Sequence, residues 1–272
     1  MEIWNNIYEI FNPVAFSIFG LKVHWYGLMY ASALIVAIQY AKYIVKKDSI
    51  NITNDHLDTY IIYVEIGVVL GARLGYLLFY SDNPMYYITN PLQIFNPFSQ
   101  SGEFVGISGM SYHGALIGFL IGTLIYIRKY DYKFWMLMDL VAISVPLGYI
   151  FGRIGNFLNK ELIGMPTDMS IGIYVDGILR HPSQLYEAIL EGLLIAIVIY
   201  IVRNKKVFKN RLIFIYLGLY AIARFVVEFV REPDANIGYI CCDWLSMGQF
   251  LSIIMFVGTI LLFLQTRKYT QQ

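Results

Sequence analysis

Seven apolar stretches, each close to the length of a membrane-crossing helix, dominate this chain of 272 residues. A helix that crosses the hydrocarbon core of a bilayer needs about 20 mostly apolar residues. Only 14% of the residues are charged, whereas a soluble domain has about 25%. The sequence therefore predicts an all-α polytopic membrane protein with about seven transmembrane helices, over roughly residues 25–45, 58–80, 113–128, 134–152, 183–202, 211–230 and 248–266.

Basic residues predict the orientation of these helices. They gather in the segments that follow the first, third, fifth and seventh stretches. With seven spans all four clusters lie on one side, which the positive-inside rule assigns to the cytoplasm, whereas six or eight spans would divide them. We expect the N-terminus outside and the C-terminus in the cytoplasm. The clusters are Lys46 and Lys47; Arg128, Lys129 and Lys133; Arg203, Lys205, Lys206, Lys209 and Arg211; and Arg267 and Lys268.

The segments assigned to the outer side are rich in aromatic residues, among them Trp4 and Tyr8. Most of these rings are expected to form an aromatic belt at the membrane–water boundary. Residues 1–20 are expected to lie on the outer leaflet without spanning it. Residues 153–182 are expected to form a small outward-facing cap, in which Asp176-Gly177 indicates a tight hairpin. No internal repeat or soluble domain is visible, so the sequence predicts a single membrane domain over residues 1–272.

The overall charge and the cysteines exclude several classes of function. A net charge of +1 indicates no nucleic-acid partner. The adjacent Cys241 and Cys242 offer neither a disulfide framework nor a metal-ligand spacing, and the four histidines show no paired zinc spacing. Residues 1–20 lack the basic start and cleavage site of a signal peptide. We expect no metal and no cofactor.

The stretch from Gly152 to Gly164 follows directly on an apolar run and is unusually mixed in chemistry. It holds Arg153, Asn156 and Glu161 among three glycines. Arginine offers a planar fork of donors that fits phosphate, and glycine lets the backbone approach a ligand closely. At the end of a membrane span this pattern favours a lipid head-group site. A hydrophilic loop between two helices is the alternative.

Ionisable residues inside a bilayer are costly and tend to be functional. In the sixth stretch Tyr216, Tyr220, Arg224 and Glu228 follow one another at steps of four residues. That spacing places them on one helix face. Alternatively, the arginine and the glutamate only pair and hold helices together. Pro233, in the run from Arg231 to Asp234, is predicted to end the helix.

The second and third stretches combine glycines with a few polar groups. Gly114, Gly118 and Gly122 form a small-residue stripe that favours close helix packing. His113, beside this stripe at a span boundary, is either functional or a satisfied interfacial histidine. The second stretch carries glycines at 67, 71 and 75, together with Glu65 and Arg73.

The fifth stretch begins at His181-Pro182-Ser183, where Pro182 or Ser183 indicates a helix start. Glu187 and Glu191 lie one turn apart on one face and are expected to meet Arg73 or Arg153. Asp139, in the fourth stretch, lies nearer the cytoplasm and is expected to be structural.

The run Gly152-Arg153-Ile154-Gly155-Asn156-Phe157-Leu158-Asn159-Lys160-Glu161 resembles the signature of the bacterial prolipoprotein diacylglyceryl transferases. The resemblance covers most of the chain. One departure is Ala115, where the family usually has a second glycine. Three further runs support the resemblance: residues 113–118, residues 181–187, and residues 224–229 followed by 231–234.

The resemblance implies an activity and its partners. Such an enzyme moves a diacylglyceryl group from phosphatidylglycerol to the thiol of the lipobox cysteine in a prolipoprotein signal peptide, and glycerol phosphate leaves. The resemblance places the protein in the bacterial cytoplasmic (plasma) membrane, among membrane lipids, with the active site toward the outer leaflet. It implies no cofactor.

The resemblance also implies roles for individual residues. Arg153 and Arg224 are expected to hold the lipid phosphate and offset its developing charge. His113 is the expected general base for the thiol, although the arginines alone could lower the pKa of that thiol enough. Catalytic roles are thus expected for His113, Arg153 and Arg224, and substrate binding for Tyr26, Arg153, Asn156, Glu161, Gly164, Tyr220, Arg224 and Glu228. Glu161 and Glu228 are the expected counter-ions of the arginines in the empty site.

Other classes of protein remain open at this point. A transporter would also suit seven spans with intramembrane charges, but transporters often show paired half-chain repeats, and none is visible. A receptor does not require so many phosphate-type ligands in one outer segment. A different lipid-modifying transferase is the closest enzymatic alternative.

Overall fold

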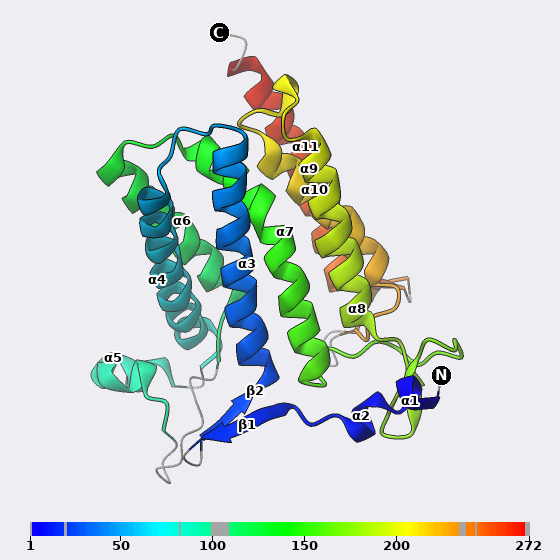
Figure 1. Ribbon diagram of the computed structural model, residues 1–272. Helices are drawn as coiled ribbons and strands as arrows, with labels where there is room; N and C mark the ends of the chain where they lie inside the picture. The colour runs from blue at the N-terminus through cyan, green and yellow to red at the C-terminus, as the bar shows by residue number, and fades with distance from the viewer. Residues whose placement is uncertain are drawn as a thin grey trace. The chain divides into compact units, whose positions relative to one another are not determined.

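The computed structural model describes residues 2–18, 21–81, 83–98, 109–233, 238–242 and 244–269. Helices make up most of the described chain (Figure 1). The chain divides into two compact units, which we describe separately. The larger unit comprises Met1–Asp48 with Met138–Gln272, and the smaller unit comprises Ser49–Leu137. A single domain over the whole chain stays a prediction.

Five of the described helices are long and apolar enough to cross a membrane, so the chain is a multi-pass membrane protein of the all-α class. Two further helices lie where spans were predicted: α6 (Tyr112–Tyr130) and α10 (Leu212–Val227). α10 is short, with 16 residues, and α6 has polar residues at both ends. A total of seven spans and their orientation stay predictions. The five are α3 (Trp25–Lys47), α4 (Asn54–Phe79), α7 (Phe134–Leu158), the continuous segment Ser183–Val202 and Met247–Thr266 within α11 (Met247–Tyr269).

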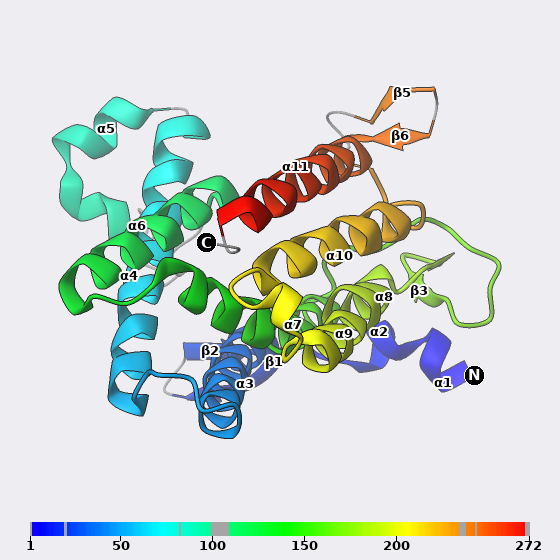
Figure 2. The same ribbon diagram turned by 90° about the horizontal axis from the view of Figure 1, so that it is seen from above.

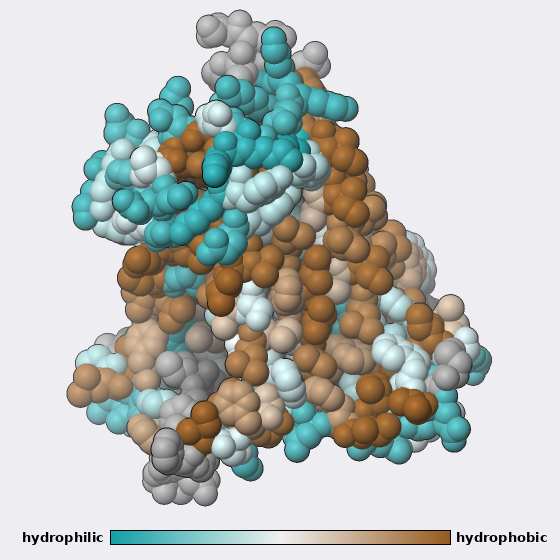
Figure 3. Space-filling model, in the orientation of Figure 1, coloured by the Kyte–Doolittle hydropathy of each residue, from teal (hydrophilic) through white to brown (hydrophobic). Residues whose placement is uncertain are grey.

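The segment Ser183–Val202 has a buried face, which carries Glu187 and Glu191, and an exposed apolar face. It consists of α8 (Ser183–Glu187), a π-helical stretch η2 (Ala188–Leu194) and α9 (Ile195–Val202). Much of the surface of the larger unit around its helices is brown, and thus apolar, in Figure 3. An apolar row this exposed is suited to hydrocarbon rather than to water. The row consists of Ile189, Leu193, Ile197 and Ile201, which are 45–64% exposed.

In the smaller unit, glycines on α4 and α6 let the two helices touch backbone to backbone. A Cβ atom on Gly118 would lie 1.9 Å from the carbonyl oxygen of Gly67, and one on Gly71 would lie 2.3 Å from that of Gly114. The predicted small-residue stripe is therefore confirmed, and α4 supplies its matching half. Arg73 of α4 donates to the carbonyl oxygens of Ile94 at 2.5 Å and Gly109 at 3.2 Å.

In the larger unit, α10 lies between α11 and the Ser183–Val202 helix (Figure 2). The helix α10 ends at Val227, well before Pro233, so the predicted helix end is wrong. A tertiary contact explains the earlier end, because Arg231 forms an isolated β-bridge with Gly164, which requires an extended backbone. The predicted start of the fifth helix at Ser183 is confirmed.

The helix α7 continues to Leu158, six residues beyond the predicted end at residue 152. The proposed cap over 153–182 is therefore too long at its start. Phe157 is buried against Tyr8 and Ile173, and this packing extends the helix. The helix stops before Lys160, which adopts a left-handed backbone with φ 58°. The first half of the glycine-rich motif is thus helical, and Arg153 and Asn156 project from a rigid element.

The N-terminal segment forms short elements that pack on the C-terminal end of α7. Trp4 stacks on Phe157 at a centroid distance of 6.0 Å and donates to the Ile171 carbonyl at 2.8 Å. Tyr8, predicted as part of an aromatic belt, is only 6% exposed because its ring packs on Phe157. The elements are α1 (Glu2–Asn5), α2 (Ile7–Ile10), β1 (Val14–Ile18) and β2 (Leu21–His24), with the two strands antiparallel.

The predicted hairpin at Asp176-Gly177 is confirmed. Strands β3 (Ile173–Val175) and β4 (Ile178–Arg180) pair antiparallel across these two residues, both of which have positive φ. A second hairpin, β5 (Tyr239–Cys241) with β6 (Leu245–Ser246), was not predicted. Asp234 lies outside the described residues. The remaining elements are α5 (Pro84–Thr89), η1 (Pro91–Phe95) and η3 (Lys206–Phe208).

Candidate functional site: a buried arginine–glutamate cluster

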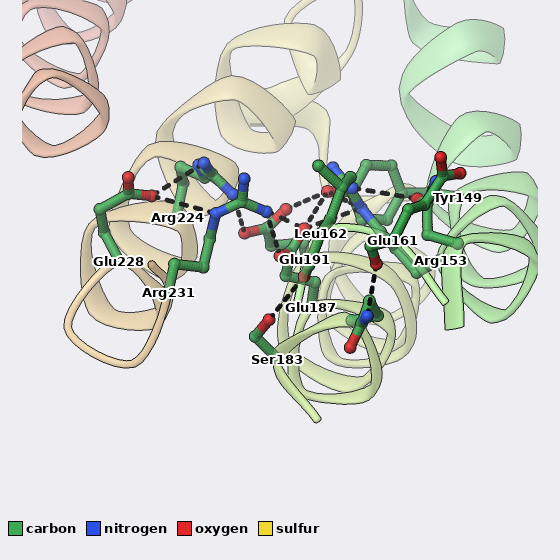
Figure 4. A network of polar contacts seen from close by, with 12 residues as sticks. Tyr149, Arg153, Glu161, Leu162, Ser183, Glu187, Glu191, Arg224, Glu228 and Arg231 are labelled. Carbon is green, nitrogen blue, oxygen red and sulfur yellow. Dashed lines mark hydrogen bonds and ion pairs between the residues drawn. The ribbon is translucent and has the colours of Figure 1, made fainter. Parts of the chain in front are cut away.

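Glu187, at the end of α8, is completely buried and contacts three arginines. Its Oε2 atom lies 2.8 Å from Arg153 Nε and 3.6 Å from Arg224 Nη1. Its Oε1 atom lies 2.7 Å from Arg231 Nη1. Figure 4 shows these side chains converging from α7, α8, α10 and the segment after α10. The two arginines expected to act together are therefore brought to one carboxylate oxygen.

Two further glutamates complete this group, which we call the arginine–glutamate cluster. Glu228 Oε2 lies 2.8 Å from Arg224 Nη2 and 3.7 Å from Arg231 Nε. Glu191 Oε1 lies 4.0 Å from Arg224 Nη1. The cluster consists of Arg153, Arg224, Arg231, Glu187, Glu191 and Glu228, so its members' formal charges balance.

The π-helical stretch η2 shapes the acidic side of the cluster. Glu187 precedes this stretch and Glu191 lies within it. A π-helical turn widens the helix and is often found at functional sites. η2 approaches α7 closely, because a Cβ atom on Gly192 would lie 2.5 Å from Ile150 Cγ1. Local packing thus presents both carboxylates to Arg153 and Arg224.

The charges of the cluster are buried unequally. The glutamates at 187 and 191 are fully buried, whereas the side chains of Arg153 and Arg224 are each 17% exposed. A buried carboxylate is tolerated only when it is paired and hydrogen-bonded. The arginines pair closely with Glu187, whereas Glu191 Oε1 lies 4.0 Å from Arg224 and has no hydrogen-bond partner among the described residues. Part of the surface of Arg153 and Arg224 stays exposed.

The glycine-rich motif extends the network toward the C-terminal end of α7. Arg153 Nη1 donates to Asn156 Oδ1 at 3.2 Å, and Asn156 Nδ2 donates to Glu161 Oε1 at 2.8 Å. The expected counter-ion pair of Arg153 with Glu161 is wrong, because Glu187 neutralises Arg153 and Asn156 stands between. The expected pair of Arg224 with Glu228 is confirmed.

Tyr26 and Tyr220 lie near this network. Tyr26, at the start of α3, packs on the motif, because a Cβ atom on Gly155 would lie 3.3 Å from Tyr26 Cδ2. The Tyr220 ring meets that of Tyr149 edge-on, with centroids 6.0 Å apart. The structure thus places Tyr26 against Gly155 of the glycine-rich motif and Tyr220 against Tyr149, and the roles of both tyrosines in binding stay predictions.

Gly164 is enclosed by backbone. A Cβ atom there would lie 2.6 Å from the Val230 carbonyl oxygen and 2.7 Å from that of His181. Its amide donates to the His181 carbonyl at 3.1 Å. This close approach holds the β-bridge that places Arg231. Burial lowers the pKa of the neighbouring His181 imidazole below its ordinary value.

His113 begins α6 in the smaller unit, where Ser111 caps the helix by accepting from the Gly114 amide at 3.2 Å. The arginine–glutamate cluster belongs to the larger unit. The approach of His113 to that cluster therefore stays a prediction, as does its role as general base.

Sequence reasoning missed Tyr149 and Arg231 as members of the site. The Tyr149 hydroxyl donates to Glu191 and accepts from Arg153 Nε at 2.7 Å. The spacing of four residues from Tyr149 to Arg153, and of three from Glu228 to Arg231, was an available signal. The expected contact of Glu187 with Arg153 is confirmed.

Asp139, on α7, lies apart from the cluster and bonds the backbone at the start of α10. It accepts from the Asn210 amide at 2.6 Å and the Leu212 amide at 2.8 Å, which supports the structural role expected for it. Within the part of the chain that the structure describes, no group of three or more His, Cys, Asp or Glu residues is arranged to hold a metal.

Several apolar helices around a cluster of three arginines and three glutamates define a multi-pass membrane protein with a charged internal site. Comparison with known proteins makes this class specific. Residues 13–265 match the family model described as prolipoprotein diacylglyceryl transferase, and the chain belongs to that family.

Curated relatives agree over nearly the whole chain. A phosphatidylglycerol–prolipoprotein diacylglyceryl transferase of Campylobacter jejuni subsp. jejuni serotype O:23/36 is 60% identical over 97% of each chain. The protein of that name from Campylobacter curvus is 58% identical over 98% of each chain. That from Campylobacter lari is 58% identical over 94% of each.

Proposed function

We propose that the protein transfers the diacylglyceryl group of phosphatidylglycerol to the lipobox cysteine thiol of a prolipoprotein and releases glycerol phosphate. One structural observation carries the proposal: Arg153 and Arg224, from separate helices, meet at one buried carboxylate of Glu187. The curated relatives, whose names state this activity, support it at 58–60% identity.

The reaction is a displacement at the glyceryl carbon that carries the phosphate ester. The thiolate sulfur forms a bond to this carbon as the carbon–oxygen bond breaks, and the electron pair of that bond goes to the leaving phosphate oxygen. Two guanidinium groups stabilise this charge in a low-dielectric site. Arg153 and Arg224 bind the phosphate, and Asn156 adds a hydrogen bond. Tyr26, Glu161, Gly164, Tyr220 and Glu228 complete the binding site.

The thiol must lose its proton before it attacks, because the thiolate is the nucleophile. His113 is the proposed general base. A His113→Gln enzyme with near-normal turnover at neutral pH would show that the arginines alone produce enough thiolate. Loss of activity together with loss of the His113-dependent limb of the pH–rate profile supports the role as base.

We further propose seven spans in the bacterial cytoplasmic membrane, with the cluster toward the outer leaflet and the N-terminal segment lying on it. Ile3 and Ile10 of that segment are 76% and 67% exposed, as expected for residues that enter the interface. Exposed Cys241 and Cys242, between α10 and α11, report the orientation. In intact cells a membrane-impermeant maleimide should label them, and should not label a cysteine placed at Lys205 in a cysteine-free background.

One assay separates the proposed transferase from its alternatives. Purified protein is supplied with phosphatidylglycerol labelled in its acyl chains and a lipobox peptide. Transfer of label to a Cys-containing peptide, but not to its Ser-containing counterpart, supports the proposal. Movement of lipid or peptide across proteoliposomes without a covalent product would favour a transporter.

A further inference from the structure

Tyr149 connects the two charged sides of the arginine–glutamate cluster. It lies on α7 one helical turn before Arg153, and thus on the same face. Its hydroxyl accepts a hydrogen bond from Arg153 Nε at 2.7 Å and donates to the carboxylate of Glu191. The same hydroxyl lies 3.5 Å from Glu187 Oε2. One neutral group thus bridges a cation and two carboxylates.

The aromatic ring of Tyr149 contributes separately from its hydroxyl. Arg153 Cζ lies 4.7 Å from the ring centroid, within the range of a cation–π contact. The ring of Tyr220 packs edge-on against it, at an interplanar angle of 85°. A phenylalanine would keep both ring contacts, so a Tyr149→Phe variant isolates the hydroxyl group.

The hydroxyl restricts the orientation of the Arg153 guanidinium. Nε of Arg153 is held by Tyr149 and Glu187, and Nη1 donates to Asn156. Among the described residues no hydrogen bond from Nη2 is seen. Because the guanidinium is planar and rigid, contacts at Nε and Nη1 fix the direction of Nη2. The N–H groups of Nη2 are thereby available to a phosphate oxygen.

We propose that the Tyr149 hydroxyl is a positioning group that aims the Arg153 guanidinium at the phosphate of the lipid substrate. This inference rests on the proposed function. Without the hydroxyl, Glu187 alone holds Nε and Glu191 loses its donor, so the guanidinium is free to turn toward Glu191. The charge of Arg153 remains, but its hydrogen-bonding edge is misdirected.

A double-mutant cycle tests this dependence on Arg153. Tyr149→Phe should lower kcat/KM on the order of 10- to 100-fold, because a small misplacement of a substrate-holding group costs this much. Arg153→Lys has no planar fork to aim. The variant with both changes should therefore match Arg153→Lys within about threefold, since interacting residues are not additive. An equal loss in both backgrounds, or normal activity of Tyr149→Phe, would overturn the proposal.

Two additions keep the test decisive if the Arg153→Lys enzyme is inactive. First, the Tm of each purified variant is measured in mixed micelles with phosphatidylglycerol and with phosphatidylcholine. The difference between the two Tm values then replaces kcat/KM in the same double-mutant cycle. This readout also holds if the wild type makes no product, in which case the proposed function fails separately. Second, Tyr60→Phe is the matched control, because Tyr60 is also buried and its hydroxyl forms a hydrogen bond with Thr123 at 3.1 Å. The Tyr60→Phe enzyme should keep the activity of the wild type and its Tm shift with phosphatidylglycerol.

Discussion

The carboxylate of Glu187 lies 2.8 Å from Arg153 Nε and has no exposed surface. It is also the only one of the three cluster glutamates within 4.0 Å of all three arginines at 153, 224 and 231. Because the formal charges of the cluster balance, loss of this carboxylate leaves one positive charge unmatched in a low-dielectric environment. Glu187 therefore holds the three arginines of the cluster together.

Glu187→Gln keeps the size of the side chain and removes its charge. Breaking a buried ion pair costs about 3–5 kcal/mol, so a large drop in thermal stability and a loss of transferase activity are expected. The measurement is thermal unfolding of purified protein in detergent, together with the labelled-lipid assay. Glu232→Gln is the control: Glu232 is 54% exposed and pairs with Arg180, and such a pair contributes about 1 kcal/mol or less. Similar stability losses in both variants would contradict the central role of Glu187.

Replacing Arg153 or Arg224 by lysine tests the proposal that their planar forks bind the lipid phosphate. Lysine keeps the charge but cannot make a bidentate contact. Arg153→Lys and Arg224→Lys should each lower kcat/KM about 100-fold or more, the loss seen when a donor to a developing oxyanion is removed. Arg203→Lys is the control and should keep activity. Arg203 lies at the far end of the Ser183–Val202 helix, where its Nε is 2.8 Å from Asp48 Oδ2. Full activity of Arg153→Lys would remove the basis for bidentate phosphate binding.

Much of this architecture could be predicted because its signals are local. The length of the apolar stretches located the helices, and glycines every four residues predicted that α6 packs closely against another helix. The four-residue spacing from Arg224 to Glu228 likewise predicted their ion pair, since both lie on one helix face. Such features depend only on helix geometry, which a sequence pattern reports directly.

Features that depend on contacts between distant segments were not predicted. α7 continues to Leu158 because Phe157 packs on Tyr8 of the N-terminal segment, and nothing near residue 152 signals this. The sequence left Arg73 and Arg153 open as partners of Glu187, and only the contact between α7 and α8 selects Arg153. Tyr149 was overlooked because its four-residue spacing from Arg153 does not by itself show that the hydroxyl bonds Arg153 and Glu191.

The glycine contact between α4 and α6 makes a sharp stability prediction. A methyl group at Gly118 would meet the Gly67 carbonyl oxygen at 1.9 Å, so the helices must separate. Gly118→Ala should therefore destabilise the protein by about 3 kcal/mol or more, at or beyond the upper end for overpacking. Gly258→Ala in α11 is the control, because a Cβ atom there meets nothing within 4 Å. It should be neutral or stabilise by about 0.5–1 kcal/mol, since alanine favours the helix. Equal melting temperatures for the two variants would refute the close contact.

His181 predicts how stability depends on pH. Burial lowers the pKa of its imidazole in the folded protein, whereas the unfolded chain keeps a value of about 6.5. Below this value the unfolded state binds more protons than the folded state, so stability falls as the pH drops through 6.5 toward the folded pKa. His181→Asn retains a polar group near the Tyr186 hydroxyl, which lies 3.2 Å from Nδ1, and removes the titration. Melting temperatures measured from pH 8 to pH 5 should fall more steeply for the wild type than for His181→Asn. Parallel curves for the two proteins would show that burial of this imidazole does not affect the pH dependence of stability.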